Sequence, residues 1–361
     1  MPDADQTVAQ PPRKGRGAVS NDTGRFERHT YSAFDDGWPS DEALPPLRTT
    51  VSVDTARSII TTNTSPDIPF DRSINPYRGC EHGCIYCFAR PTHAYCGLSP
   101  GLDFESRLFF KPDAAELLEA ELRRPGYQPA VIALGTNTDP YQPIEREKQL
   151  TRAILKVLSN YRHPVGIVTK SALVLRDIDI LGPMAAQGLA AVTISVTTCD
   201  RRLARLMEPR APTPAKRLAA IEALSAAAIP TGVLAAPMIP ALNDMELESI
   251  LEAASRAGAS GAGYVLLRLP LEIKDLFEDW LRSHFPDRAD HVMSLVRDTR
   301  KGKAYRAEWG ERMKGSGAYA DLLKQRFELA RKRCGLDRRH LDLDVTRFQP
   351  PPRSGDQLTM F

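Results

Sequence analysis

Short apolar runs alternate with amphipathic segments through the middle of the chain. Between the runs, apolar residues recur at helical spacing, as at Leu117, Leu118 and Leu122. The expected strands are Ser73–Tyr77, Ala130–Gly135, Pro164–Thr169, Ala191–Thr197, Thr231–Ile239 and Gly263–Leu269. The expected helices are 113–124, 146–159, 174–187, 214–228 and 245–257. Six strand–helix units predict an α/β fold, an open, partial (β/α)6 barrel whose mouth is lined by the carboxyl ends of its strands.

The segment ahead of this alternation has a different pattern. Residues 1–47 combine charged residues with prolines and glycines, so they predict a disordered N-terminal arm. Residues 48–60 alternate apolar and polar positions, which indicates one or two short strands. We therefore expect the barrel unit to cover residues 48–270.

The C-terminal part of the chain is expected to be helical. From residue 271 onward the pattern is helical only, and Tyr319–Cys334 has the apolar spacing of a long amphipathic helix. We expect a basic helical extension over 271–340 and a disordered, flexible tail over 341–361, where prolines and glycine interrupt regular structure.

Charge is unevenly distributed along the chain. Residues 291–340 hold fourteen Lys or Arg and six Asp or Glu, a balance of +8, whereas the whole chain carries +3, which leaves −5 for the remainder. Such a segment is typical of a face that binds a polyanion such as nucleic acid, although a solvated helical surface gives the same count.

The bulk composition is that of an ordinary water-soluble protein, with 42% hydrophobic and 26% charged residues. There is no apolar run of about 18 residues, and the polar start does not resemble a signal peptide, so we expect a cytoplasmic protein without a membrane partner. Six cysteines, three of them close together, fit a reducing compartment better than a disulfide framework.

The clustered cysteines are Cys80, Cys84 and Cys87, spaced C-x3-C-x2-C, with the aromatic Tyr86 before the third. Three thiolates so close together make a soft metal site. An ordinary cubane cluster takes four cysteines, so three leave one iron open to bind a substrate or cofactor. The loop over 80–87 directly follows the first expected strand, a position that suits a cofactor loop at the barrel mouth.

Structural zinc is the main alternative for these cysteines. Zinc favours a closed tetrahedron, and either His82 or His93 could be its fourth ligand. No second C-x2-C or H-x3-H element follows, which argues against an ordinary zinc module. A catalytic redox pair would need a thioredoxin-like context that the sequence lacks.

The residues around the cysteines resemble a known family. The segment Ser73–His93 is similar to radical S-adenosylmethionine (SAM) proteins of the branch related to spore photoproduct lyase, often labelled DNA repair photolyase-like. Further matches are Thr136–Glu145, Val168–Ser171, Ile194–Val196, Glu208–Arg210 and Pro237–Pro240. The likeness extends over roughly residues 48–340.

This resemblance implies a radical SAM enzyme with a [4Fe–4S] cluster on Cys80, Cys84 and Cys87. The open iron would chelate SAM, and an electron from the cluster would cleave it to a 5′-deoxyadenosyl radical that abstracts a hydrogen atom from a substrate. It further implies a nucleic acid substrate, in repair or modification, and a reductant such as flavodoxin or ferredoxin. The alternative is a zinc- or cluster-stabilised nucleic-acid-binding protein without radical chemistry.

The resemblance also implies the residues that bind SAM. Thr136 and Asn137 end the second expected strand and would face its amino acid moiety. Lys170 ends the third and would bind its carboxylate, Ser195 in the fourth would face its ribose, and Tyr86 would stack near its adenine.

One position departs from the family pattern. Spore photoproduct lyase carries a cysteine just before the Thr/Ser at the end of the second strand, and that thiol returns a hydrogen atom to the product. Here the position is Gly135, so the specific lyase reaction is in doubt. Cys199, just after the fourth strand, and Tyr141 are the remaining candidates for catalytic side chains.

The last residues resemble a binding motif for the bacterial sliding clamp. Gln357 would supply a directional hydrogen bond, and Leu358, Met360 and Phe361 would enter an apolar groove of the clamp. A tail that folds back on its own domain is the alternative.

Overall fold

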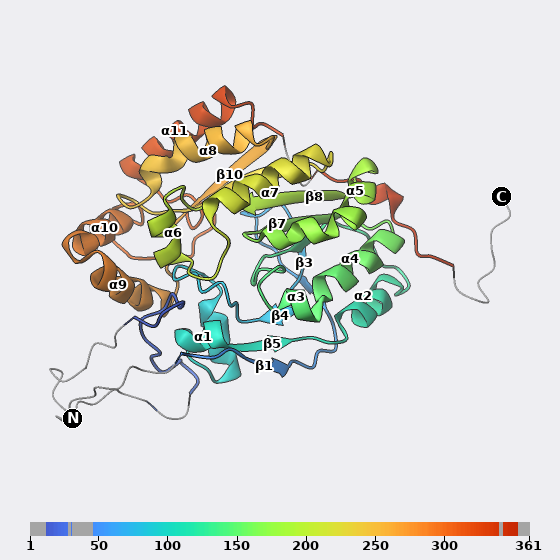
Figure 1. Ribbon diagram of the computed structural model, residues 1–361, viewed down its shortest axis with the longest axis horizontal. Coiled ribbons are helices and arrows are strands. Elements are labelled where there is room, and N and C mark those ends of the chain that lie inside the picture. The colour runs from blue at the N-terminus through green and yellow to red at the C-terminus, as the bar shows by residue number, and fades with distance from the viewer. Residues whose placement is uncertain (1–11, 28–29, 31–45, 339–341, 353–361) are drawn as a thin grey trace.

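The computed structural model describes residues 12–27, 30, 46–338 and 342–352. Its centre is a seven-stranded sheet in the order β10-β9-β8-β7-β6-β3-β2 (Figure 1). The strands are β2 (Ile60–Thr62), β3 (Arg72–Ile74), β6 (Ile132–Leu134), β7 (Val165–Thr169), β8 (Ala190–Ser195), β9 (Thr231–Met238) and β10 (Gly261–Leu266). Neighbouring strands pair in parallel, except that β2 is antiparallel to β3. The six parallel strands are the six expected from the sequence.

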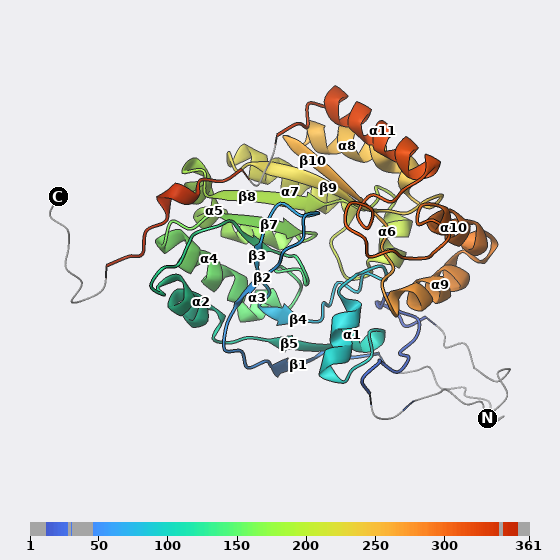
Figure 2. The same ribbon diagram turned by 180° about the vertical axis from the view of Figure 1, so that it is seen from behind.

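Helices cover one face of this sheet, and Figure 2 shows the strands from the opposite face. They are α2 (Ala114–Leu122), α3 (Glu145–Lys148), α4 (Leu150–Asn160), α5 (Ile178–Ala186), α7 (Pro214–Ala226) and α8 (Leu247–Arg256). In α8, Leu247, Ile250, Leu251 and Ala254 are buried in the main core, because their spacing places them on one stripe of the helix. The predicted α/β fold with an open, partial (β/α)6 barrel is confirmed.

A second, three-stranded sheet lies beside the barrel in the order β1-β5-β4. Its strands are β1 (Thr50–Val53), β4 (Tyr77–Arg78) and β5 (Arg107–Phe110), and the short strands expected within 48–60 correspond to β1 and β2. Between β4 and β5 the chain forms the 3-10 helix η1 (Arg90–Cys96) and α1 (Leu102–Ser106). The segment from β4 to η1, residues 79–89, carries the clustered cysteines and is called the cysteine loop below.

The remaining helices are α6 (Arg201–Met207), α9 (Ile273–His284), α10 (Pro286–Asp298) and α11 (Ala318–Arg333), with short 3-10 turns η2 (Ala172–Asp177), η3 (Asp244–Glu246) and η4 (Val345–Arg347). Phe327 of α11 packs into the main core, and Trp280 of α9 shares a second core with Ile85 of the cysteine loop. The helices of residues 271–340 therefore pack into the cores of the barrel. Among the described residues, no helix has the length and apolar character needed to cross a bilayer.

The expectation of a disordered arm over 1–47 is wrong for residues 12–27. Arg16 is 7% exposed and Ala18 is fully buried. The backbone N–H groups of Gly17 and Ala18 both donate to the carboxylate of Glu105 at 2.8 Å. A polar segment is ordered here because a buried carboxylate far along the chain satisfies its backbone. Of the flexible tail predicted over 341–361, residues 342–352 are described and Phe348 packs against the main core, whereas residues 341 and 353–361 lie outside the described residues.

Candidate active site

The three clustered cysteines lie on the cysteine loop, where Cys80 and Cys84 are buried and Cys87 is partly exposed. Burial raises the pKa of Cys84 to about 12. The pKa of Cys80 is also raised, first by burial, then by Asp139 and by the other two thiols. Three thiolates here would therefore repel one another unless a cation neutralised them, which is what a metal centre does. The donor set fits an iron–sulfur cluster.

A single zinc ion fits the same region poorly. Within the described ranges, no three or more His, Cys, Asp or Glu side chains are placed to hold a metal ion. The ring of His93 is bonded through Nε2 to the carbonyl of Arg107 at 3.0 Å and packs against Phe104. His82 instead lies 3.4 Å from Asp139. Neither histidine is therefore free to complete a closed tetrahedron with the three thiols, whereas a polynuclear cluster needs no fourth protein ligand at its open iron.

Gln142 fixes the start of the cysteine loop. Its side-chain oxygen accepts a hydrogen bond from the backbone N–H of Glu81 (2.9 Å), and its amide donates to the carbonyl of Gly79 (3.1 Å). Gln142 is fully buried, so both bonds are sheltered from water. The segment after β6 thereby sets the position of Cys80.

A buried ion pair between Arg90 and Glu105 fixes the other side of the loop. Arg90 also donates to the carbonyl of Cys84 (2.9 Å), so the pair is tied directly to a cysteine. Because Glu105 also holds the backbone of Gly17, the N-terminal segment is pressed onto the loop. A Cβ at position 17 would collide with the carbonyl oxygen of Gly83.

A second buried carboxylate, Glu208, lies under Tyr86. It accepts hydrogen bonds from the hydroxyls of Tyr86 and Thr197 and pairs with Arg217. Its Oε1 is 4.0 Å from Nζ of Lys170, and that ammonium group lies 5.7 Å from the centre of the Tyr86 ring. The residues predicted to bind adenine and carboxylate, Tyr86 and Lys170, are therefore neighbours.

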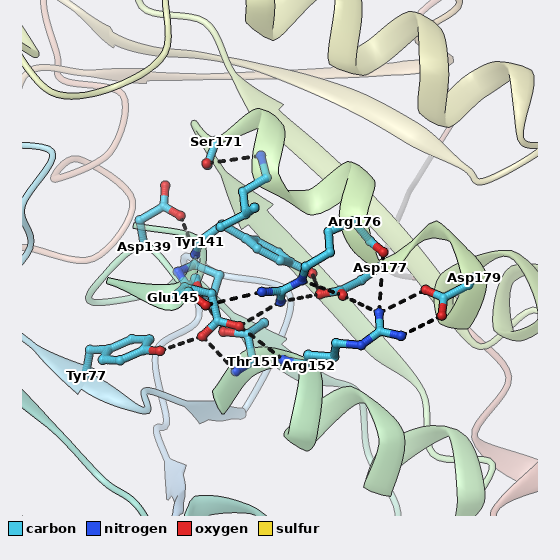
Figure 3. Close-up of polar contacts among 12 residues, drawn as sticks. Tyr77, Asp139, Tyr141, Glu145, Thr151, Arg152, Ser171, Arg176, Asp177 and Asp179 are labelled. Carbon is cyan, nitrogen blue, oxygen red and sulfur yellow. Dashed lines mark hydrogen bonds and ion pairs between the residues drawn. The ribbon is translucent and has the colours of Figure 1, made fainter. Parts of the chain in front are cut away.

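Asp139 orients the backbone around Lys170. Its carboxylate accepts hydrogen bonds from the hydroxyl of Thr169 (2.6 Å) and the backbone N–H of Lys170 (2.8 Å). It also accepts one from the backbone N–H of Tyr141 at 2.9 Å (Figure 3). Burial by itself raises the pKa of this carboxylate, but His82 and the hydrogen bonds from Lys170 and Thr169 bring it down to about 2. An ionised Asp139 thus holds the end of β7 against the segment that follows β6.

Figure 3 also shows the network that encloses Tyr141. The carboxylate of Glu145 accepts from the hydroxyl of Tyr77, just ahead of the cysteine loop, and pairs with Arg176. The hydroxyl of Tyr141 donates to Asp177 at 3.1 Å. Tyr141 is fully buried in the main core, so this geometry favours a structural role over the catalytic one suggested by the sequence.

The other predicted residues lie at the same edge of the sheet. Thr136 and Asn137 follow β6 and are partly exposed, and among the described residues neither side chain forms a hydrogen bond. Ser195 ends β8 and is 3% exposed. Because β6, β7 and β8 are parallel, their carboxyl ends bring these groups to one mouth together with Lys170. Cys199 instead packs against the main core.

Gly135 leaves no room for the missing thiol. Its φ is +88°, and a Cβ at this position would collide with the carbonyl oxygen of Val168. Any side chain at position 135 would require the backbone to move. The departure from the family pattern is therefore built into the backbone.

Sequence reasoning did not identify Gln142, Arg90 or Glu105 as supports of the site. Gln142 lies within a family motif, so its position carried a signal. Arg90 lies within the family segment Ser73–His93 as well, but Glu105 had no signal, because residue types alone do not reveal which charges are buried together.

Comparison with known proteins agrees with this geometry. The family model described as the radical SAM superfamily matches residues 74–254. An uncharacterized protein of Mycobacterium tuberculosis is 38% identical over 232 residues, which cover 64% of this chain and 68% of that protein. An uncharacterized protein of Methanocaldococcus jannaschii is 31% identical over 173 residues, 48% of this chain and 62% of that protein.

Solved structures show the same fold. A spore photoproduct lyase complexed with dinucleoside spore photoproduct has a TM-score of 0.56 at 16% identity, over 78% of this chain and 79% of that chain. A spore photoproduct lyase variant with bound AdoMet and dinucleoside spore photoproduct has a TM-score of 0.55 at 17% identity, over 78% of each chain.

Proposed function

The chain belongs to the radical SAM superfamily, and from that premise we propose that it cleaves SAM reductively and abstracts a hydrogen atom from a nucleic acid. The superfamily uses a [4Fe–4S] cluster and SAM, so these are its cofactors. When bound, they supply a reducing electron and a carbon–sulfur bond for it to break. The protein binds and orients both groups and excludes water.

The observation that carries this proposal is the fixed cysteine loop at the mouth. In it, Cys80, Cys84 and Cys87 are the proposed ligands of the cluster. Gln142 and Arg90 hold the loop from either side through hydrogen bonds to its backbone. Such supports keep ligands in place before the cluster binds.

For SAM we propose the five residues expected from the sequence: Tyr86, Thr136, Asn137, Lys170 and Ser195. The side chain of Lys170 is 17% exposed, and its ammonium group lies 4.0 Å from the carboxylate of Glu208. A carboxylate of SAM would give it a closer, charge-assisted hydrogen bond. The unbonded side chains of Thr136 and Asn137 can serve the ammonium and carboxylate groups of the same ligand.

Nucleic acid is the substrate class that the charge distribution favours. Many basic residues between 291 and 340 are neutralised, as in Arg326 with Glu248 and Arg312 with Asp67. Among the described residues, the cations of this segment that have no ion pair are Arg300, Lys303, Lys314, Lys324, Lys332 and Arg338. The lyase that shares the fold was solved with a dinucleoside ligand. We propose a repair or modification reaction on nucleic acid, with flavodoxin or ferredoxin as the reductant that supplies the electron.

The direct test is anaerobic purification. We expect brown protein with about four irons and four sulfides per chain, and release of 5′-deoxyadenosine and methionine from SAM on reduction. Cys84→Ala should lose both iron and SAM cleavage, whereas Cys334→Ala, which removes a thiol packed against the main core, should keep both. Colourless protein with one zinc per chain would reject the proposal in favour of a binding protein.

We further propose that the C-terminal residues Gln357, Leu358, Met360 and Phe361, which lie outside the described ranges, dock into the bacterial sliding clamp. The test is titration of the clamp with the full-length chain and with a chain ending at Asp356. Tight binding by the full-length chain alone supports docking. Equal binding by both, or by neither, rejects it without touching the radical SAM assignment.

A further inference from the structure

The loop between α10 and α11, residues 299–317, bridges the two edges of the barrel sheet. The carbonyl of Met313 accepts a hydrogen bond from the N–H of Leu266 at the end of β10 (2.8 Å). Arg312 pairs with Asp67, between β2 and β3, at 2.6 Å, and the N–H of Gly310 donates to the same carboxylate at 2.7 Å. Because β10 and β2 are the edge strands, this bridging loop spans the open side of the barrel.

Arg268 lies where the bridging loop, β10 and the cysteine loop meet. It follows β10 by two residues, and its guanidinium carbon lies 5.0 Å from the ring centre of Phe88. Phe88 comes directly after Cys87 and is 45% exposed, which is unusual for a large apolar side chain. An arginine stacked on an exposed ring therefore stands beside the proposed cluster ligands.

Arg268 forms no direct ion pair among the described residues, although its charge, after the hydrogen bond from Gly310 and the pair with Arg312, contributes to the lowered pKa of Asp67. Its Nη1 donates only to the sulfur of Met313 (3.3 Å), and its Nε is buried without a hydrogen-bond partner. The nearby carboxylate of Asp67 already binds Arg312 and Gly310. A guanidinium group that forms no ion pair and has N–H donors to spare at its Nη atoms is suited to bind an external anion.

A second guanidinium group, that of Arg300, lies near Arg268 and makes an anion at this position more favourable. Arg300 is 1% exposed and gives its hydrogen bonds to backbone carbonyls, those of Leu267 (2.8 Å) and Glu311 (2.6 Å). Burial, and then the charge of Arg268, lower the pKa of Arg300 to about 10. An anion at Arg268 would relieve this repulsion between like charges.

We propose that Phe88 and Arg268 bind one nucleotide of a single strand at the rim of the active site. The base stacks on the exposed face of Phe88, and the adjoining phosphate takes the free donors of Arg268 in a forked contact. Lys303 and Lys314 on the bridging loop, exposed and without an ion pair among the described residues, continue the path for the backbone. This inference rests on the proposed nucleic acid substrate and names where it binds.

The test is fluorescence anisotropy of labelled single-stranded oligothymidylate with anaerobic holoenzyme. Arg268→Ala should weaken binding by about tenfold or more and reduce the slope of log K against log salt by about 0.7, the value for one phosphate of a single strand. Phe88→Ala should weaken binding by about fivefold or more at an unchanged slope, and Phe88→Trp should restore it. Arg268→Lys should keep the slope with reduced affinity, because charge remains but the fork is lost.

Arg282→Ala is the matched control, since it removes the same charge from an exposed arginine of α9 and should leave affinity within about twofold. The iron content of each variant reports on whether its fold is intact. If Arg268→Ala loses iron, the affinity and salt slope of Arg268→Lys test the proposal in its place. Wild-type protein that binds no oligonucleotide would overturn the nucleic acid substrate itself. If the wild type binds the oligonucleotide and the Arg268 and Phe88 variants bind it with the same affinity, this inference alone would be overturned.

Discussion

Replacing Glu208 by glutamine tests the charge cluster under the cysteine loop. Glu208 is 2% exposed, accepts hydrogen bonds from Tyr86 and Thr197, and pairs with Arg217. Burial alone raises its pKa, yet the charges of Arg217 and Lys170 bring it from 4.5 down to about 2. The folded protein therefore stabilises the ionised carboxylate strongly.

The size of this stabilisation follows from the fall in pKa. A fall in pKa from 4.5 to about 2, a change of about 2.5, corresponds to roughly 3–4 kcal/mol at about 1.4 kcal/mol per pH unit. Removing one member of a buried ion pair costs a similar amount, about 3–5 kcal/mol, because the other charge, here Arg217, stays buried without compensation. We expect Glu208→Gln to lower the free energy of unfolding by about 3 kcal/mol at neutral pH.

The folded and unfolded pKa values of Glu208 also determine how the free energy of unfolding changes with pH. Because the folded pKa lies below the unfolded one, the stabilisation is complete above about pH 4.5 and is lost as the pH falls towards 2. The difference between wild type and Glu208→Gln should therefore be constant from about pH 6 to about pH 9.

Urea denaturation under anaerobic conditions measures both expectations. Glu222→Gln is the control, because it makes the same change at an exposed position of α7, the helix that carries Arg217, and should stay within about 0.5 kcal/mol of wild type. A Glu208→Gln protein that unfolds at the wild-type urea concentration would refute the reasoning. A difference in the free energy of unfolding between wild type and Glu208→Gln that changes between about pH 6 and pH 9 would also refute it.

Three further predictions follow from the supports of the site. Lys170→Ala should weaken SAM binding by roughly 10- to 150-fold at unchanged iron content, and equal affinity by calorimetry would remove this residue from the site. Glu105→Gln should release the N-terminal segment, because an amide cannot pair with Arg90 and accept hydrogen bonds from two backbone N–H groups as a carboxylate does. The readouts are faster proteolysis before residue 27 and loss of iron on dilution. Wild-type rates of both would contradict the prediction. Gly135→Ala should lower the free energy of unfolding by more than about 1 kcal/mol, since its Cβ meets the carbonyl of Val168, and a wild-type urea midpoint would count against the strain.

The barrel could be predicted from the sequence because its strands are buried apolar runs and its helices carry one apolar stripe. Both patterns are local, so Thr231–Ile239 predicted β9 and 245–257 predicted α8 to within a few residues. The N-terminal segment was not accessible, because its order depends on Glu105, 88 residues beyond Gly17. Long-range polar contacts leave no periodic signal.

The same distinction holds for the site. The spacing of the cysteines and the family motifs drew attention to Tyr86 and Lys170, which the structure brings together. The expectation of a basic face was too coarse, since the acids that neutralise many of these cations come from other elements, as Glu248 does for Arg326. Only the fold reveals that Arg268, outside the basic segment, forms no ion pair with the residues that the structure describes.

The distribution of thiols restricts the reaction at this mouth. All six cysteines lie in the described part of the chain: three on the cysteine loop, Cys199 and Cys334 against the main core, and Cys96 beside Arg78 of the small sheet. Position 135 cannot carry a thiol without a shift of the backbone. Cys199, which follows β8 and is partly exposed, stays a candidate for the thiol that returns a hydrogen atom to a substrate. Any such thiol must lie at a position other than 135, and in this the chain departs from the family pattern.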